Sequence, residues 1–243
     1  MTDPLTLPKS EIAYLKVKQD ILSGRLSDDA PLRIEALKSH YDVGITPIRE
    51  ALARLEAEGF VKLHHNRGYY TTPLSAEDFE DLVFSRATVE TELLRRSIAR
   101  GGEDWEVRLV AAHRRLGNCK LDLRDPDLTD LERWEERHIE FHMALVGAAG
   151  AKHLLAFYRS IYDHFRRHQK AFVLLPSANR VGKGDAEALR AIEELERRMS
   201  SEEHTGLMNA ALDRDVDLAV RLIRDHSSLE PSKIGVPYFV GSR

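Results

Sequence analysis

Apolar residues in the first 74 positions recur at helical spacing in three short stretches. These stretches are residues 11–23, 34–40 and 46–58. Thr46 and Pro47 predict the start of the third helix, as its N-cap and its first helical residue, and Gly59 predicts its end. Two short strands, 60–64 and 69–72, are expected around the turn that follows. Three helices followed by a β-hairpin predict a winged helix-turn-helix.

The remainder of the chain has a helical pattern without a convincing pair of strands. The expected helices span about 76–100, 104–119, 127–148, 152–174, 185–212 and 216–228. We therefore predict a mainly α protein, in which a winged helix-turn-helix precedes an all-α helical bundle. The predicted domains are a DNA-binding domain at 1–74, a helical domain at 75–229 and an irregular tail at 230–243.

The composition is that of a globular protein and does not by itself indicate a nucleic-acid partner. Of the 243 residues, 42% are hydrophobic and 31% are charged, which is ordinary for a globular protein. A single cysteine, Cys119, and the lack of a signal peptide or a long apolar run predict a cytoplasmic location. The net charge is −4, and residues 1–74 contain ten basic and ten acidic residues. A DNA-binding role must therefore depend on where the basic residues lie.

The third helix is expected to enter the major groove of DNA, because the second helix of a helix-turn-helix motif reads bases with its N-terminal residues. Arg49 is the best candidate for reading a base, since a guanidinium can pair with both acceptors of guanine. The wing offers Arg67 to the DNA backbone or to the minor groove, and the second helix offers contacts to phosphates. The alternative is that these are solvated residues of an amphipathic helix. The candidate DNA contacts are Arg33, Lys38, Thr46, Arg49, Arg67 and Gly68.

Four histidines lie on the apolar stripes of the second domain. His138 and His142 are spaced i, i+4, so both imidazoles can reach one metal ion. His204 and His226 lie nine and eleven residues from a tight turn at 213–215, which places them at the same level of a helical hairpin. Together they predict a site for a divalent transition metal such as Zn or Ni. The alternative is that they are core histidines with satisfied hydrogen bonds.

Arg86 is a second unusual residue, because it lies on the apolar stripe of the helix at 76–100. A buried guanidinium needs an anionic partner. Glu90, four residues later, would provide an ion pair within the helix, whereas a bound carboxylate would make Arg86 part of a ligand site. Both interpretations remain open. Arg159 and Tyr162 are weaker candidates for the same pocket.

A family resemblance is carried by four segments of the first domain, 22–26, 46–52, 55–61 and 66–68. They resemble the GntR family of bacterial regulators. The helical remainder resembles the FCD effector domain of the FadR subgroup. The family usually has Ser-Arg before Thr46, whereas this chain has Gly44 and Ile45, so one usual DNA-contacting arginine is absent.

The resemblance implies a homodimeric transcriptional regulator that binds double-stranded operator DNA and responds to a small organic acid. It also implies a metal bound by an Asp or Asn, a His four residues later and two further histidines, with His138 here in the Asp position. The segment 98–106 is similar to carbon-starvation regulators, which favours a dicarboxylate effector. The chain is not expected to be an enzyme. The alternative considered is a metal-dependent hydrolase, in which the winged helix only mediates assembly.

Overall fold

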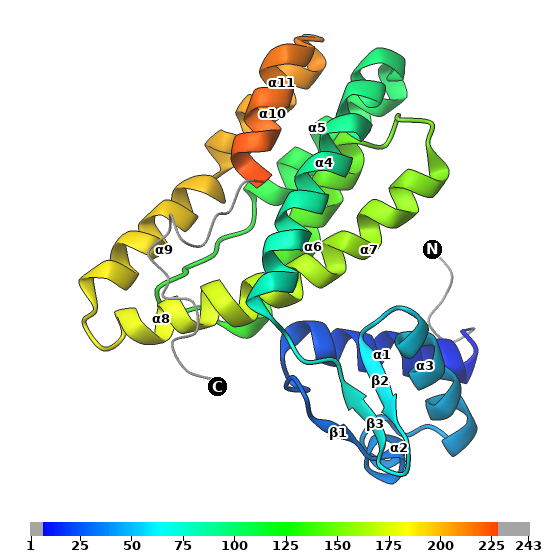
Figure 1. Cartoon of the computed structure of the whole chain (residues 1–243). Helices are drawn as coiled ribbons and strands as arrows, with labels where there is room; N and C mark the ends of the chain where they lie inside the picture. Colours follow the sequence, from blue (N-terminus) through cyan, green and yellow to red (C-terminus); the bar gives the residue numbers. More distant parts are fainter. Residues whose placement is uncertain (1–6, 228–243) are drawn as a thin grey trace. The chain divides into compact units, whose positions relative to one another are not determined.

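The computed structural model describes residues 7–227, and its internal contacts divide the chain into two compact units, Met1–Ser75 and Ala76–Arg243 (Figure 1). The predicted tail at 230–243 lies outside the described residues. No helix within the described part is long and apolar enough to cross a membrane.

The first unit contains three helices and a small antiparallel sheet of order β1-β3-β2. Its core is formed by the apolar faces of all three helices together with Leu32, Phe60 and Val61. This arrangement is a winged helix-turn-helix, as predicted. The elements are α1 (Lys9–Ser23), β1 (Pro31–Leu32), α2 (Ile34–Tyr41), α3 (Ile45–Ala57), β2 (Val61–His64) and β3 (Gly68–Thr71).

Two local details of this unit differ from the sequence prediction. Helix α3 begins at Ile45 with Gly44 as its N-cap residue, so Thr46 is the second helical residue and not the cap. Strand β1 was not predicted, because only two residues pair with β3 and one of them, Pro31, is a poor strand residue. These two residues form a strand because β3 lies beside them, and not because their own sequence favours a strand.

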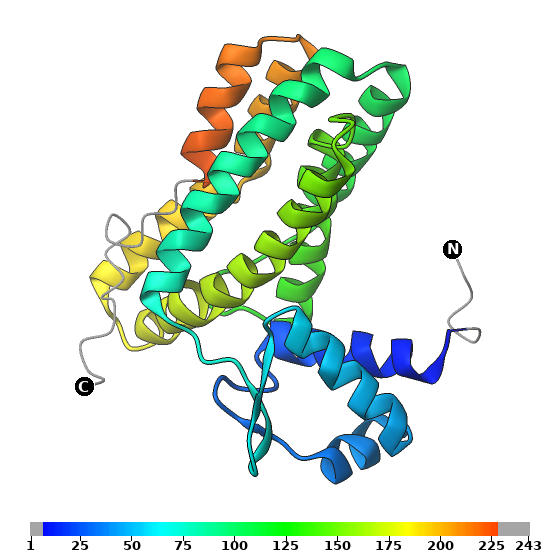
Figure 2. The same cartoon turned by 45° about the vertical axis from the view of Figure 1, so that its right-hand side comes forward.

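The second unit is helical in all its described elements, and the predicted fold class is confirmed. Helix α4 packs against α7 and α11, while α5 packs against α6 and α10 (Figure 2). The elements are α4 (Ala76–Arg100), α5 (Glu103–Gly117), α6 (Leu128–Leu145), α7 (Lys152–Gln169), the π-helix η2 (Lys170–Leu174), α8 (Leu175–Val181), α9 (Ala186–Arg198), α10 (Ser201–Leu212) and α11 (Val216–Ser227).

Two predicted helices of this unit are wrong in extent. The helix expected at 185–212 is two helices, because Ser200 caps α10 by accepting a hydrogen bond from the backbone N–H of Glu203. The helix expected at 152–174 continues through η2 into α8, which has Pro176 in its first turn. Pro176 has no N–H to donate to an earlier turn, which accounts for an altered hydrogen-bond register there.

Candidate metal centre and nucleic-acid interface

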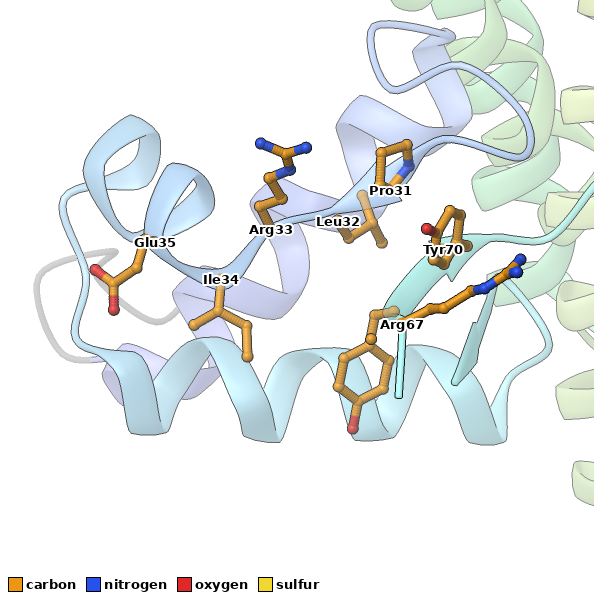
Figure 3. Close-up of a pocket in the computed structure, with 9 residues that line it drawn as sticks. Pro31, Leu32, Arg33, Ile34, Glu35, Arg67 and Tyr70 are labelled. Carbon is orange, nitrogen blue, oxygen red and sulfur yellow. The ribbon is translucent and has the colours of Figure 1, made fainter. Parts of the chain in front are cut away.

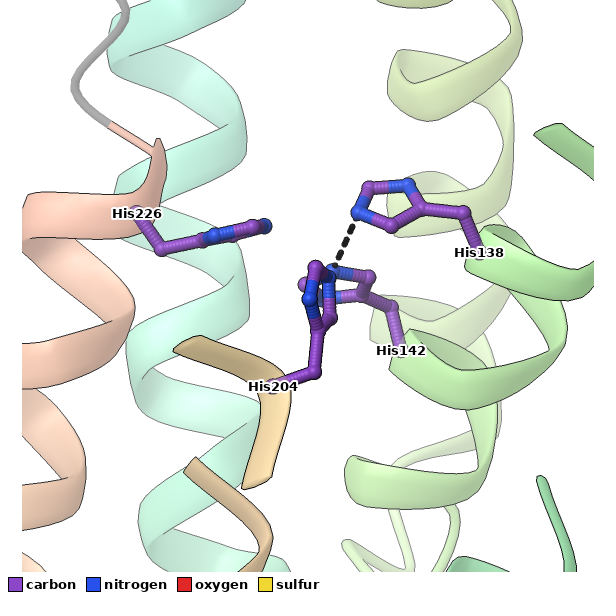
Figure 4. Close-up of side chains that lie close together, drawn as sticks. All are labelled: His138, His142, His204 and His226. Carbon is purple, nitrogen blue, oxygen red and sulfur yellow. Dashed lines mark hydrogen bonds between the residues drawn. The ribbon is translucent and has the colours of Figure 1, made fainter. Parts of the chain in front are cut away.

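The four histidines singled out in the second unit converge on one point. His138 and His142 come from α6, His204 comes from α10 and His226 comes from α11 (Figure 4). One nitrogen from each ring lies within 4.8 Å of the others, and the residues are between 0% and 6% exposed. The helical spacing on α6 and the tight turn between α10 and α11 therefore bring together the residues that sequence reasoning grouped.

Two of the rings are oriented by hydrogen bonds from their outer nitrogens. Nδ1 of His142 donates to Oε1 of Glu90 at 2.6 Å, and Nδ1 of His204 donates to the backbone carbonyl of Ser200 at 2.7 Å. An imidazole that donates from Nδ1 presents the lone pair of Nε2. Nε2 of His204 is buried without a hydrogen-bond partner. Both rings thus direct an electron pair toward the centre of the cluster.

His138 closes a short hydrogen-bonded chain with its neighbours. Its Nδ1 contacts the hydroxyl of Tyr162, and its Nε2 lies 3.0 Å from Nε2 of His142. Because Nε2 of His142 presents a lone pair, the bond between the two rings requires a proton on Nε2 of His138. A tyrosine hydroxyl can donate or accept, so Tyr162 can also hold His138 in the opposite tautomer. In that tautomer the Nε2 of His138 becomes available to a metal.

The electrostatic environment keeps the imidazoles neutral. Burial, reinforced by the neighbouring rings, lowers the pKa of His138 and His226 well below the usual value. Burial lowers the pKa of His204 to about 3. The pKa of His142 is also lowered by burial, although Glu90 opposes the shift. Neutral histidines are the form that binds metal ions, so the cluster needs no proton release before binding.

Glu90 on α4 connects the cluster to Arg86. Its carboxylate accepts hydrogen bonds from His142, from the hydroxyl of Tyr158 at 2.5 Å and from the hydroxyl of Ser227 at 3.0 Å. Burial alone would favour the neutral acid, but His142 and Arg86 lower the pKa of Glu90 to about 2. Sequence reasoning placed Glu90 beside Arg86 but missed its bond to His142. No sequence signal pointed to Tyr158 or Ser227.

Arg86 is 1% exposed and forms an ion pair with Glu90. Its Nε lies 3.4 Å from Oε2 of Glu90, but neither Nε nor Nη2 makes a hydrogen bond. The guanidinium carbon lies 5.0 Å from the ring centre of Tyr162 and 4.6 Å from that of Phe165. The ion pair expected within the helix is therefore present, although neither of these two nitrogens has a hydrogen-bond partner.

Tyr162 and Arg159, the two weaker candidates for the effector pocket, lie in different places in the structure. Tyr162 is buried between His138 and Arg86. Arg159 is exposed and lines a different hollow of about 480 Å³, together with Arg108, Glu140 and Asp163. The prediction that Arg159 shares a pocket with Arg86 disagrees with this position, because Arg159 and the buried Tyr158 lie on different faces of α7.

The candidate DNA contacts lie on the surface of the first unit. Thr46 and Arg49 are exposed on the first turns of α3, and Ile45, at the usual arginine position, is 38% exposed. Lys38 is exposed on α2, with its Nζ 3.4 Å from Glu35. Gly68 has a φ of +88°, which favours glycine at the end of the wing turn.

Arg33 and Arg67 lie at a hollow between the start of α2 and the wing (Figure 3). The hollow has a volume of about 500 Å³, and Pro31, Leu32, Tyr69 and Tyr70 also line it. Both arginines are exposed. The arrangement leaves both groups accessible to a charged partner.

A winged helix with exposed basic residues, joined to a helical unit with a buried cluster of four histidines, is the architecture of a DNA-binding regulator. Residues 9–70 match the family described as "Bacterial regulatory proteins, gntR family", and residues 81–229 match the FCD domain. The chain belongs to the GntR regulators that carry an FCD domain. It is a DNA-binding transcriptional regulator and not an enzyme, so the hydrolase alternative is not supported.

Relatives and solved structures agree with this assignment. The HTH-type transcriptional regulator BphR of Paraburkholderia xenovorans (strain LB400) is 32% identical over 217 residues, which cover 89% of this chain and 81% of BphR. The HTH-type transcriptional repressor GlaR of Escherichia coli (strain K12) is 32% identical over 213 residues, covering 88% of this chain and 90% of GlaR. The structure of E. coli McbR/YncC has the same fold, with a TM-score of 0.68 at 13% identity over 94% of this chain and 98% of that one.

Proposed function

We propose that the protein is a metal-dependent, ligand-controlled regulator in which His138, His142, His204 and His226 bind one divalent transition metal. The donor set supports this proposal. Four neutral imidazoles from three helices surround one point, and the buried Nε2 of His204 has no protein partner. Imidazole nitrogens suit Zn, Ni and related ions, and Zn or Ni are the expected occupants.

The proposed effector is a small organic acid whose carboxylate binds beside the metal. The main support for a carboxylate effector is Arg86, a buried guanidinium whose Nε and Nη2 have no hydrogen-bond partner. A carboxylate is the group that a guanidinium recognises with two parallel hydrogen bonds. Tyr162, which contacts both Arg86 and His138, would lie against the same ligand. A dicarboxylate is one member of this class.

The same helix would transmit the state of the site. Arg86 and Glu90 both belong to α4, which begins at Ala76 directly after the DNA-binding unit. A ligand that binds Arg86 competes with Glu90, and Glu90 in turn links α4 to α6, α7 and α11. Differential binding of this kind changes the packing of α4, which is what an allosteric response requires.

We further propose that the regulator acts as a homodimer on a two-fold symmetric operator. In this arrangement Arg49 reads a base, while Thr46, Arg33, Lys38 and Arg67 contact phosphates, and Gly68 shapes the wing turn. The exposure of these side chains supports the proposal. The name of GlaR, a repressor, favours repression as the mode of action.

A thermal-shift screen of organic acids, with and without Zn²⁺, tests the effector site. We expect an acid to raise the melting temperature of the metal-loaded protein more than that of the chelated protein. Arg86→Met should abolish the response to the acid while retaining Zn²⁺, and Arg159→Met, at an exposed arginine, should respond like the wild type. If Arg86→Met kept the full response, the carboxylate role of Arg86 would be wrong.

A further inference from the structure

The histidine cluster is buried, so any metal ion or effector must reach it through the protein. A surface pocket of about 270 Å³ lies beside the cluster, with Cys119, Leu121, Trp134, Glu196, Met199 and Ser200 among its lining residues. It combines apolar side chains with a thiol, a carboxylate and hydroxyl groups. This mixture of chemistry differs from that of the sealed apolar core.

Two of the lining residues contact the histidines directly. The indole of Trp134 stacks on the ring of His138, with 4.4 Å between ring centres and 20° between planes. The carbonyl of Ser200 accepts the hydrogen bond from Nδ1 of His204 at 2.7 Å. The inner wall of the pocket is thus one residue thick at two of the four rings.

The pocket lies where helices end, so it can open with the loss of few hydrogen bonds. Cys119 and Leu121 lie in the connection between α5 and α6, while Met199 and Ser200 lie at the break between α9 and α10. Movement of such helix ends and of one indole disturbs fewer hydrogen bonds than separation of helices in the middle of the bundle. The break at Ser200, which the apolar periodicity did not predict, supplies one side of the pocket.

We propose that this pocket is the entrance to the histidine cluster, through which the metal ion and then the effector pass Trp134 and Ser200. The inference rests on the proposed metal site. The lining suits a divalent cation in transit, because the carboxylate of Glu196 provides a weak ligand at the mouth. The carboxylate of Glu196 lies 3.7 Å from Arg124, which moderates its repulsion of an incoming acid.

The single cysteine of the chain allows a direct test, since a thiol reagent can modify only Cys119. The Zn²⁺-loaded protein is treated with a bulky pyrene maleimide or with the small reagent methyl methanethiosulfonate. Zn²⁺ release to excess chelator is then followed. We expect the bulky adduct to slow release by about tenfold or more while equilibrium Zn²⁺ affinity changes little, because an obstructed path changes rates and not the end states. The small adduct and a Cys119→Ser protein exposed to the maleimide should release Zn²⁺ at the unmodified rate.

A second pair of variants makes the result independent of thiol chemistry. Leu121→Trp adds bulk inside the pocket and should slow release in the same way, whereas Val107→Trp adds the same bulk at a side chain that is 62% exposed on α5. If the bulky adduct, Leu121→Trp and the wild type released Zn²⁺ at equal rates, the pocket would not be the entrance, but the proposed metal site would stand. A wild-type protein that binds no Zn²⁺ would overturn the metal site as well.

Discussion

Glu90 on α4 accepts a hydrogen bond from Nδ1 of His142 on α6 at 2.6 Å, and neither residue is exposed. The bond decides which nitrogen of His142 faces the other three rings. The same carboxylate lies 3.4 Å from Arg86. A single buried acid therefore orients a candidate metal ligand and forms an ion pair with the candidate effector-binding arginine.

Replacement of Glu90 by glutamine should weaken metal binding. The amide retains an acceptor for His142 but removes the charge that fixes its tautomer and raises its basicity, and outer partners of this kind are worth about 10–100-fold in affinity. Titration of Zn²⁺ against a competing chelator measures the effect. Glu92→Gln is the matched control, because Glu92 lies on the same helix but pairs with the exposed Arg96. Equal affinities for the two variants would contradict the role of Glu90.

Removal of the metal should lower the thermal stability of the helical unit. A ligand that binds only the folded state adds about 1.4 kcal/mol for each tenfold excess over its dissociation constant. Chelation should therefore lower the melting temperature of the wild type, and His204→Ala should remove this response. His168→Ala is the control, since His168 is also buried but lies outside the cluster. A chelator response that survived in His204→Ala would exclude His204 as a ligand.

The metal-free protein should lose stability as the pH falls from about 6.5 toward 3. The unfolded chain takes up a proton at His204 near the ordinary pKa of 6.5, whereas the folded chain resists protonation until about pH 3. The unfolded state thus binds more protons in this window, and one such histidine costs roughly 1.4 kcal/mol per pH unit. Glu90, with its pKa lowered to about 2, acts in the same direction below its usual value of 4.5.

Urea unfolding of the metal-free protein at several pH values measures this dependence. The variant His204→Gln should show a flatter decline, because it lacks one of the groups that titrate differently in the two states. An unchanged slope in this variant would show that His204 does not contribute.

Two arginines of the first unit should affect DNA binding in different ways. Arg49→Ala should cost about 1–3 kcal/mol on the operator and relax the preference for one base, whereas Arg67→Ala should weaken binding to all sequences and reduce the salt slope by about 1. Gel-shift titrations on specific and scrambled DNA distinguish these outcomes. Identical losses on both DNAs for Arg49→Ala would assign that residue to the phosphate backbone instead.

Arg54 provides the control on α3 for these measurements. Its guanidinium bonds to Glu11 at 2.7 Å and lies 3.5 Å from the ring centre of Tyr14, so it belongs to the packing between α1 and α3. Arg54→Ala should lower the stability of the winged helix and leave base preference unchanged.

Much of the architecture follows from local patterns. The apolar stripes of α1, α3, α4 and α11 are regular enough to show the helices and their buried faces. Strand β1 and the division at Ser200 were missed, because one depends on a partner strand and the other on a capping bond within an otherwise helical pattern. Arg159 was misplaced because residues three apart on a helix are offset by about 60° around its axis, so Tyr162 can be buried while Arg159 is exposed.

The sequence by itself determined the winged helix, the helical second unit and the four histidines as one group, since periodicity and residue type encode buried faces. Only the tertiary structure decided that Glu90 bonds to His142, that two nitrogens of Arg86 have no hydrogen-bond partner and that Trp134 and Ser200 separate a pocket from the rings. The reason is physical. Helical spacing specifies the direction of a side chain, whereas contacts between α4, α6, α7 and α10 depend on how helices far apart in the chain pack together.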